Sequence, residues 1–458
     1  MALVLLACAC IRVAFWTYGA DTGTFAIAIQ NVPHAMYDPF EGGSHFRFHW
    51  SPILAALYPL LAVVPSVLAL QILQILLVVG AVFAYYSLIE PYLGAPLALR
   101  CAIVALLYPP LIALAFSEFH ELAFAPILTF LALRAVSLRK WTWYALCAVL
   151  LSCVREDVAL LTGLFGALLV GYGLLPCHRE LVEREAHPGI ARQAPVLRQA
   201  QDDKAFVIAG IATMIGDAIV LLLYFGVLIP HLGGWVPSAF YAYPYHNGIV
   251  AVARQILTVG RLTYLLEVVV PLALLPLLTP WFWLAVPGLA IVLLANSGEV
   301  WRMGMHYVAL WLPWVLLAMA AGVSQIHSRA GERAAAGWVS VATALCVLFL
   351  IFFNPTHAAH YLRPGYADMS AVRQVMHCVP ADAMLATHDE WYAAMAFRHP
   401  NVTIGPSPSA AYWLLADDYP NAEFQEKGLP EVRRQVANGA MKEICRSDRV
   451  AVYRRVRQ

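Results

Sequence analysis

Ionisable side chains gather at the ends of long apolar runs in this sequence. One group occupies residues 117–122 between two such runs, Asp21 follows the first run, and residues 155–157 follow another. A charged side chain costs several kcal/mol at the centre of a bilayer, so charges kept at the ends of spanning helices are functional candidates. Carboxylates and imidazoles can take a proton from a hydroxyl group, and guanidinium groups bind phosphate oxygens. These residues therefore indicate chemistry at a membrane surface.

The acidic candidates allow two chemical roles. Asp21, Glu118 and His120 could act as catalytic acid–base groups. Asp21, Glu118 and Glu121 could hold Mg or Mn, since these ions prefer carboxylate oxygens. A purely structural interpretation is also open. Asp21 would then cap the helix that follows it, and the other acids would cap the next helix.

A second set of residues would hold the substrate. Arg155, Glu156 and Asp157 have apolar residues on both sides, so their charges must pair internally or face water. Arg155 would suit a lipid phosphate, because arginine makes bidentate contacts to oxyanions; an ion pair with Asp157 or Glu156 is the alternative. The remaining members of the predicted substrate-binding set are His49, Arg302 and His306.

His45 and His49 are four residues apart, a spacing that would place both on one face of a helix. Gly42, Gly43 and Pro52 flank them and indicate that only the second half of this segment is helical. We therefore do not expect a metal pair here, and we predict that His49 lines an outer cavity.

The composition is that of a polytopic membrane protein. Hydrophobic residues make up 61% of the 458 residues and charged residues only 12%, and the mean hydropathy is +0.69. The net charge of +1 gives no basic surface that would attract nucleic acid. The sequence also has no Cys-x-x-Cys pair and no glycine-rich phosphate loop. We expect neither a nucleic-acid partner nor a structural zinc site.

Apolar runs of about 20 residues predict transmembrane helices. We predict about eleven spans, and we interpret the first run as an uncleaved helix rather than a signal peptide. Residues 54–64 are apolar but short and bounded by prolines, which favours a juxtamembrane helix at the outer interface. The predicted spans cover residues 2–18, 67–88, 97–116, 122–136, 141–154, 158–174, 206–229, 262–278, 282–295, 308–323 and 338–353.

The basic residues predict the orientation, because Lys and Arg in short loops stay on the cytoplasmic side. With the N-terminus inside, the candidate residues above and everything after residue 354 fall on the extracytoplasmic face of a cytoplasmic (inner) membrane. Arg12, within the first run, would snorkel or face the helix bundle. The basic residues placed inside are Arg134, Arg139, Lys140, Arg179, Arg184, Arg192, Arg198, Lys204, Arg329 and Arg333.

Residues 354–458 have the composition of a water-soluble domain, which follows a membrane domain over residues 1–353. Charges and prolines recur, and helical patterns separate short β-rich runs. We predict a small extracytoplasmic α/β domain of about one hundred residues. Its cysteines, Cys378 and Cys445, would form a disulfide or remain unpaired. The predicted strands cover residues 384–387, 402–404, 412–416 and 450–453.

Four segments within the first 175 residues resemble, in order, the signatures of an uncharacterised family of bacterial and archaeal predicted membrane proteins. The chain departs from the pattern of that family at Glu118, Glu121 and Arg155, where the family has Asp, Pro and Lys. The layout of the family is similar to that of the C-type (GT-C) glycosyltransferases, multispanning enzymes that take a sugar from a polyprenyl-phosphate carrier at the outer membrane face. The four segments are Asp21-Thr22-Gly23-Thr24-Phe25, His49-Trp50-Ser51-Pro52-Ile53-Leu54, Glu118-Phe119-His120 and Arg155-Glu156-Asp157-Val158-Ala159-Leu160.

This resemblance implies a membrane glycosyltransferase that moves a hexosyl or pentosyl group from a polyprenyl-phosphate-linked sugar, with Asp21 as base or metal ligand. Two other classes stay open. A transporter would usually show repeated halves and helices broken at mid-membrane, and no internal repeat is visible. A non-catalytic scaffold would use its C-terminal tail to bind a partner. The aromatic loop over residues 235–246 would stack on sugar rings or form an interfacial belt.

Overall fold

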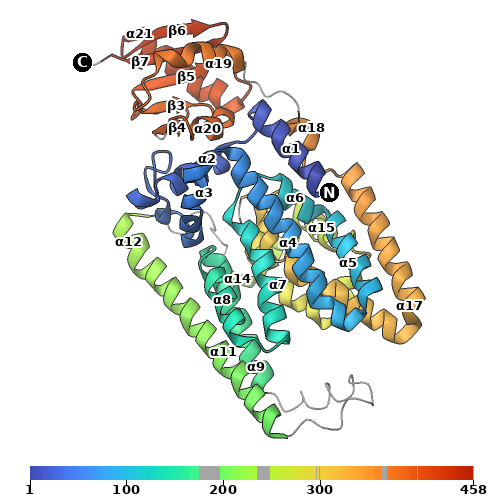
Figure 1. Ribbon diagram of the computed structural model, residues 1–458. Helices are drawn as coiled ribbons and strands as arrows, with labels where there is room; N and C mark the ends of the chain where they lie inside the picture. Colours follow the sequence, from blue (N-terminus) through green and yellow to red (C-terminus); the bar gives the residue numbers. More distant parts are fainter. Residues whose placement is uncertain are drawn as a thin grey trace.

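A bundle of helices carries a mixed α/β layer at one of its ends (Figure 1). The computed structural model describes residues 1–174, 196–234, 248–295, 297–298, 300–362, 369–399 and 401–456. Of the basic residues predicted to lie inside, Arg179, Arg184 and Arg192 fall outside the described residues.

Long apolar helices form the membrane part. Among the described residues, 4 helices are long and apolar enough to cross a membrane, and up to 6 if each of two bent pairs counts as one span. The predicted number of about eleven spans is therefore not confirmed and stays a prediction. The four long segments are Val67–Leu93 (α4), Glu156–Leu174 (α9), Lys204–Leu232 and Leu312–Phe352 (α17).

One bent pair largely coincides with the predicted span 97–116, whereas the second helix of the other pair begins after the predicted span 2–18. Helix α1 (Ala2–Phe15) and helix α2 (Ala20–Gln30) meet at 88°. Helices α5 (Ala95–Leu107) and α6 (Pro109–Phe116) meet at 53°. A proline at the start of α6 explains the second bend, because it cannot donate a hydrogen bond to the preceding turn. The first bend points α2 toward the α/β layer (Figure 1).

The predicted spans 308–323 and 338–353 lie on the two sides of a break in α17. Gly331 has φ 83° and ψ 172° there, a conformation that glycine adopts at little cost. This break, the connection between α7 and α8, and the start of α11 lie at the end of the bundle opposite to the sheet (Figure 1). That separation agrees with the predicted orientation; which end faces the cytoplasm stays a prediction.

Shorter helices complete the bundle. The predicted juxtamembrane segment is helical, as the 3-10 helix η3 (Pro52–Leu57) and α3 (Tyr58–Val63), and buries Leu54 and Leu61. The π-helix η5 (Tyr224–Leu228) joins α11 to α12. The other helices are α7 (Phe124–Ser137), α8 (Trp141–Ser152), α11 (Val196–Leu223), α12 (Ile229–Leu232), α14 (Gly248–Ile256), α15 (Val259–Val269), α16 (Val286–Leu294) and α18 (Ala358–Tyr361), with short 3-10 turns η2 (His45–Arg47), η4 (Glu121–Ala123), η8 (Pro280–Ala285) and η9 (His306–Leu310).

The C-terminal layer is a five-stranded sheet with the order β4-β3-β5-β7-β6. Strands β4, β3 and β5 are parallel, β7 pairs antiparallel to β5, and β6 pairs antiparallel to β7, so that only β7 runs against the other four. Helices α19 (Met369–Val375), α20 (Asp389–Met395) and α21 (Leu429–Ala437) accompany the sheet. The strands are β3 (Leu385–Thr387), β4 (Val402–Ile404), β5 (Tyr412–Ala416), β6 (Met441–Ser447) and β7 (Val450–Arg455).

Four of these strands occur where the sequence predicts them, because their apolar runs are buried in the sheet. Strand β6 was missed. It is an edge strand, and its charged residues Lys442, Glu443 and Arg446 point to solvent or pair on the surface. Charges of this kind are typical of strand edges that must not pair further, and they hide the strand from hydrophobicity patterns.

The core of the α/β layer continues into the first part of the chain. Ile27 of α2 and Leu54 of η3 are fully buried in the same apolar cluster as Trp391 and Tyr392 of α20. Gly23 permits this contact, because a Cβ atom there would lie 2.3 Å from the Tyr392 ring. Packing therefore runs across the predicted boundary between residues 353 and 354, and that boundary stays a prediction.

Candidate functional site

The four sequence segments with chemical candidates meet at the end of the bundle that faces the α/β layer. The ring of Phe25 lies 4.8 Å from that of His120 and 6.0 Å from that of Phe119. Nδ1 of His49 lies 2.9 Å from Oε1 of Glu156, which is 107 residues further along the chain. The fold thus assembles one polar region from segments that the sequence keeps far apart.

Glu118 caps helix α2. Its Oε1 accepts a hydrogen bond from the backbone N–H of Gly19 at 2.9 Å, and its Oε2 accepts one from Thr22 at 3.0 Å. The first N–H groups of a helix have no partner within the helix and favour a carboxylate. Thr22 Oγ1 in turn accepts the N–H of Phe119 at 3.1 Å. Asp21, for which a cap role was open, lies in the first turn of α2, and no cap hydrogen bond involves its side chain.

The segment that carries Glu118 is held on another side by Gln74 of α4. Gln74 is buried, and its Nε2 lies 3.0 to 3.2 Å from the carbonyl oxygens of Leu114, Ser117 and Glu118. Its Oε1 accepts the N–H of His120 at 2.9 Å. These bonds fix the turn between α6 and α7, and with it the position of the Glu118 carboxylate.

The carboxylate of Glu156 joins the loop after α2 to the start of α9. Besides His49, it accepts the backbone N–H of Trp50 at 2.9 Å. The indole Nε1 of Trp50 donates to the carbonyl of Ser152 at 2.7 Å. Both oxygens of Glu156 are therefore engaged by the protein itself, which favours a positioning role for this predicted substrate-binding residue.

Arg155 forms the ion pair with Asp157 that the sequence left open. Its Nε lies 3.0 and 3.1 Å from the two carboxylate oxygens, and a second nitrogen also bonds to Asp157. The guanidinium group is buried, lies 4.9 Å from the ring centroid of Tyr307, and has one nitrogen 3.8 Å from Glu121. Arg155 therefore stabilises the carboxylates around it, and its predicted contact with a lipid phosphate stays a prediction.

The imidazole rings of His120 and His306 are stacked, with their centroids 3.3 Å apart and 19° between their planes. Both side chains are buried. Burial, and then the charge of Arg155, holds the pKa of His120 well below its usual range. Burial and the adjacent His120 ring have the same effect on the pKa of His306. Both rings are therefore neutral at neutral pH.

A cavity of about 540 Å³ opens beside this region. Four predicted site residues line it: Asp21, Glu118, Arg302 and His306. Among the described residues, His49, His120, Glu121 and residues 155–157 do not line it. The predicted site thus divides into side chains that line the cavity and a buried or half-buried network beside them. Aromatic rings on the cavity wall include those of Phe116, Tyr264, Trp301, Phe349, Phe353 and Tyr361.

Arg12 faces the bundle and contributes to this cavity. It donates to the carbonyl oxygens of Phe116 and of Thr17, the latter at 2.8 Å. Its guanidinium group lies 3.9 Å from the ring centroid of Tyr18 and 4.6 Å from that of Tyr361. Of the two open interpretations, the structure supports the one in which this arginine points into the bundle. Glu267 of α15 also lines the cavity, and sequence analysis missed it.

The predicted metal ligands Asp21, Glu118 and Glu121 lie in two different surroundings. The carboxylate of Glu121 is buried, and its oxygens lie 3.0 Å from His120 and 3.8 Å from Arg155. The ligand atoms of Asp21, Glu118 and Glu121 do not form a group within 4.8 Å in the described part of the chain. Asp21 and Glu118 do share the cavity. Mg²⁺ commonly uses one or two protein carboxylates together with phosphate oxygens, and the metal site stays a prediction.

Asp217 of α11 is a buried carboxylate that sequence analysis also missed. Ser152 donates to it from α8, and Tyr144 and Thr213 make a further contact of 2.8 Å between the same two helices. The carbonyl oxygen of Ser152 also accepts the indole N–H of Trp50. Asp217 therefore stabilises the end of α8 to which Trp50 is bonded. No sequence pattern distinguishes it from an isolated polar residue in an apolar run.

Two further predictions concern His45 and the aromatic loop. His45 lies 3.0 Å from Glu41, while His49 lies 2.9 Å from Glu156, and the expectation that the two histidines are not a metal pair stays a prediction. Burial by itself would lower the pKa of His45, but the Glu41 carboxylate outweighs it and raises that pKa. The loop over residues 235–246 lies outside the described residues.

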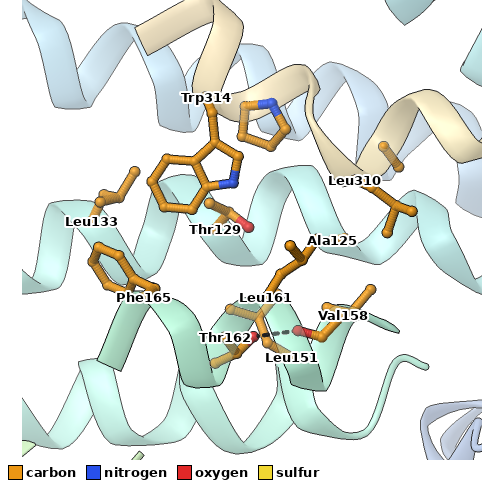
Figure 2. Close-up of a pocket in the computed structure, with 13 residues that line it drawn as sticks. Ala125, Thr129, Leu133, Leu151, Val158, Leu161, Thr162, Phe165, Leu310 and Trp314 are labelled. Carbon is orange, nitrogen blue, oxygen red and sulfur yellow. Dashed lines mark hydrogen bonds between the residues drawn. The ribbon is translucent and has the colours of Figure 1, made fainter. Parts of the chain in front are cut away.

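A second cavity lies between α7, α8, α9 and α17 (Figure 2). Its volume is about 30 Å³, which is close to the space that one water molecule takes up in the liquid. Apolar side chains, including Leu133, Phe165 and Trp314, point into it. It is too small for a substrate, so the larger cavity is the candidate site.

The fold defines the class of protein. It is a membrane protein with several helices that are long and apolar enough to cross a bilayer. Similar solved structures include ArnT from Cupriavidus metallidurans bound to undecaprenyl phosphate, with a TM-score of 0.54, 12% identity and coverage of 99% of this chain and 98% of that chain. The apo form of the same ArnT gives a TM-score of 0.52, 11% identity and coverage of 99% and 98%. At this identity the likeness concerns the fold alone.

The chain belongs to the family described as Predicted membrane protein (DUF2079), which matches residues 21–400. The match begins at Asp21 and covers all four segments from which the resemblance was drawn, so that resemblance is confirmed. A search of curated proteins gave no match to this chain.

Proposed function

We propose that this protein is a membrane glycosyltransferase that takes a sugar from a polyprenyl-phosphate carrier and transfers it to an acceptor hydroxyl. One observation carries the proposal: the carboxylates of Asp21 and Glu118 line the same cavity as Arg302 and His306. The likeness over the full chain to ArnT, solved with undecaprenyl phosphate bound, supports a polyprenyl lipid as the ligand.

Asp21 is the proposed general base. The acceptor hydroxyl gives its proton to this carboxylate while its oxygen bonds to the anomeric carbon and the sugar–phosphate bond breaks. Glu118 helps to place Asp21, because it holds the N–H groups of Gly19 and Thr22 on either side of it. The carboxylate at position 21 is thus aimed by the first turn of a capped helix.

The phosphate leaving group carries negative charge, which the cavity must balance. Arg302 is the proposed cation for this purpose, since a guanidinium group binds phosphate oxygens in a bidentate manner. His306, held neutral by its surroundings, is proposed to donate or accept a hydrogen bond at the same place. Mg²⁺ or Mn²⁺ held by Asp21 and Glu118 would add charge neutralisation at the phosphate when bound.

The proposed side of the membrane is the extracytoplasmic one. The connection between α7 and α8 and the break in α17 lie at the end opposite to the sheet (Figure 1), and basic loops stay in the cytoplasm. The cavity and the α/β layer would then both face outward.

Binding and turnover with a panel of polyprenyl-phosphate sugars test the proposal on protein purified in detergent, with and without Mg²⁺. We expect saturable binding that Arg302→Ala weakens about tenfold or more, as for the loss of a charged hydrogen bond. Asp21→Asn should keep binding and lose turnover. Matched controls are the exposed Arg433→Ala and Asp382→Asn, which should behave as wild type.

Failure to bind any member of the panel would contradict the proposal and favour a transporter or a scaffold. Full turnover in Asp21→Asn would remove the assignment of Asp21 while leaving the activity itself in place.

A further inference from the structure

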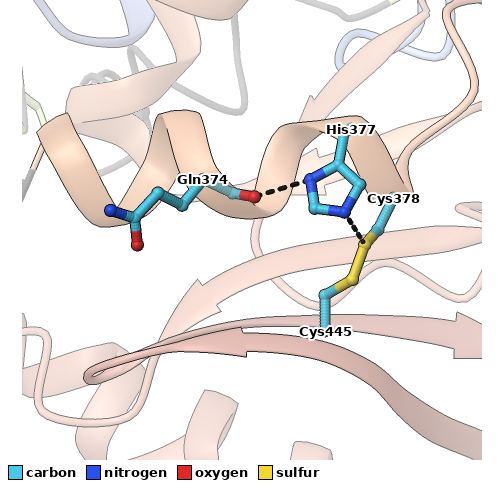
Figure 3. Close-up of a disulfide and its surroundings, with 4 residues drawn as sticks. All are labelled: Gln374, His377, Cys378 and Cys445. Carbon is cyan, nitrogen blue, oxygen red and sulfur yellow. Dashed lines mark hydrogen bonds between the residues drawn. A yellow bond between two sulfur atoms is a disulfide. The ribbon is translucent and has the colours of Figure 1, made fainter.

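A cluster of potential metal ligands lies in the α/β layer, away from the cavity. Cys378 and Cys445 are joined by a disulfide, with their Cα atoms 6.5 Å apart, and His377 lies beside them (Figure 3). Nε2 of His377 is 3.3 Å from Sγ of Cys378. In the described part of the chain, this is the only group of three or more His, Cys, Asp or Glu side chains whose ligand atoms all lie within 4.8 Å of one another.

Local backbone structure brings the cluster together. His377 and Cys378 end the 3-10 helix η10 (Met376–Cys378), which follows α19 directly. Cys445 lies on the edge strand β6, next to a shift in register between Glu443 and Cys445. Such a bulge turns a side chain away from the regular alternation of the strand. His377 is exposed, so solvent reaches the cluster.

No hydrogen atom lies between Nε2 of His377 and Sγ of Cys378 in the disulfide, for the following reason. Nδ1 of His377 lies 2.6 Å from the carbonyl oxygen of Gln374 (Figure 3), and a carbonyl only accepts, so Nδ1 carries the hydrogen. In the neutral ring Nε2 then presents a lone pair to Cys378, whose sulfur has no hydrogen in the disulfide. A thiol proton or a metal cation between the two atoms would make this contact favourable.

We propose that Cys378, Cys445 and His377 form a zinc site when the disulfide is reduced. Tetrahedral Zn²⁺ with Zn–S bonds of about 2.3 Å and Zn–N bonds of about 2.0 Å separates its ligand atoms by about 3.5 to 3.8 Å. The three ligand atoms here are within 4.8 Å of one another, so small side-chain rotations reach that geometry. The fourth position is open to water.

The hydrogen bond to Gln374 supports this assignment. Histidines that bind zinc usually donate their other ring N–H to a carbonyl or carboxylate, which fixes the tautomer and aims the free nitrogen at the metal. His377 already has this arrangement. The inference is independent of the proposed glycosyl transfer, because it concerns residues outside the cavity.

Reduction of the Cys378–Cys445 disulfide requires a two-electron reductant of the dithiol or phosphine class. The reductant supplies two electrons and two protons enter, so the disulfide becomes two thiols. Each thiol loses its proton as its sulfur binds Zn²⁺, and two protons are released. Oxidation of the pair reverses both steps and releases the ion.

The test uses the full chain purified in detergent, reduced with a phosphine, freed of reductant without air, and titrated with Co²⁺ as a spectroscopic substitute for Zn²⁺. We expect one cobalt ion per chain with thiolate-to-cobalt absorption, displaced by Zn²⁺, and no such absorption before reduction. His377→Ala retains the disulfide and should fold; because even outer-shell partners are worth about 10- to 100-fold in affinity, losing this ligand should weaken Zn²⁺ binding at least tenfold.

Cys378→Ser should abolish the absorption, whereas Cys10→Ser, which removes an exposed thiol elsewhere, should leave it unchanged. Reduced wild-type protein without thiolate-to-cobalt absorption would overturn the proposal. Absorption that persists in both Cys378→Ser and His377→Ala would also overturn it, because the ion would then be bound by other cysteines.

Discussion

His49 and Glu156 form a 2.9 Å contact between imidazole and carboxylate, and this contact ties the loop after α2 to the first turn of α9. The side chains are 28% and 14% exposed, so the pair is only partly screened by solvent. Trp50, next to His49, bonds to the same carboxylate and to the end of α8. Three segments of the chain therefore depend on one carboxylate.

Replacing that carboxylate should destabilise the fold. Glu156→Ala removes the acceptor for both His49 and the Trp50 N–H, and bonds to charged groups are worth about 1.5–3 kcal/mol each. Glu156→Gln retains an acceptor oxygen and should lose less. Thermal unfolding in detergent, followed by tryptophan fluorescence, measures both. The exposed Glu426→Ala is the control; equal loss in all three variants would contradict the role of the pair.

Glu118→Gln should weaken the cap of α2. The amide offers one acceptor where the carboxylate now serves Gly19 and Thr22 and also interacts with the helix dipole. Loss of a helix cap costs about 0.5–2 kcal/mol, which thermal unfolding would detect. Glu332→Gln, exposed near the break in α17, should be neutral. An unchanged melting temperature for Glu118→Gln would show that the cap contributes nothing to stability.

Gly23→Ala should separate α20 from α2. The added Cβ would lie 2.3 and 2.6 Å from atoms of the Tyr392 ring and 3.1 Å from the backbone N of Ala393, so the helix itself must move. We expect faster cleavage of the C-terminal part in limited proteolysis. Gly171→Ala is a matched control, since a Cβ there meets nothing within 4 Å. Identical cleavage rates for the two variants would refute the close contact.

Asp38 predicts a dependence of stability on pH. Burial, and then the Glu41 carboxylate, raises the pKa of Asp38 to about 7. The folded protein therefore keeps a proton that the unfolded chain releases near pH 4, and the free energy of unfolding falls as the pH rises from about 4 to 7. Asp38→Asn keeps an acceptor for the Tyr392 hydroxyl and should reduce this slope. Melting temperatures at several pH values would test it; an unchanged slope would contradict it.

The stacked histidines His120 and His306 predict the opposite dependence, in which the free energy of unfolding falls as the pH falls. Their pKa values are lowered in the folded state, so the unfolded chain binds protons first as the pH falls below about 6.5. Each such histidine then costs up to about 1.4 kcal/mol of stability per pH unit. His306→Phe retains a ring for stacking and should lose less stability between pH 7 and pH 5 than wild type. An equal loss would argue against neutral rings in the folded protein.

Much of the fold could be predicted from the sequence because apolar runs coincide with elements that are buried or face lipid. Strands β3, β4, β5 and β7 are examples, while β6 escaped because charged residues occupy its exposed edge. Pairing of Cys378 with Cys445 was one of two open interpretations, and the structure contains the disulfide.

The candidate site was less predictable, because residue roles depend on distant partners. Asp21 and Glu118 were expected near one another and do share a cavity. The use of Glu118 as a helix cap depends on N–H groups 99 and 96 residues away, which no local pattern reveals. Glu267 and Asp217 are single acids within apolar stretches, and only the folded arrangement distinguishes them.

The apolar core shared by α2 and α20 has a consequence for biosynthesis. Helix α2, which carries Asp21, leaves the ribosome long before Trp391 and Tyr392 of α20, which cover it. Until the C-terminal layer has been made and delivered to the same side of the membrane, the apolar face of α2 lacks its cover. The region around Asp21 is therefore completed only after α20 has been synthesised, and a chain that terminates before α20 would be a substrate for quality control.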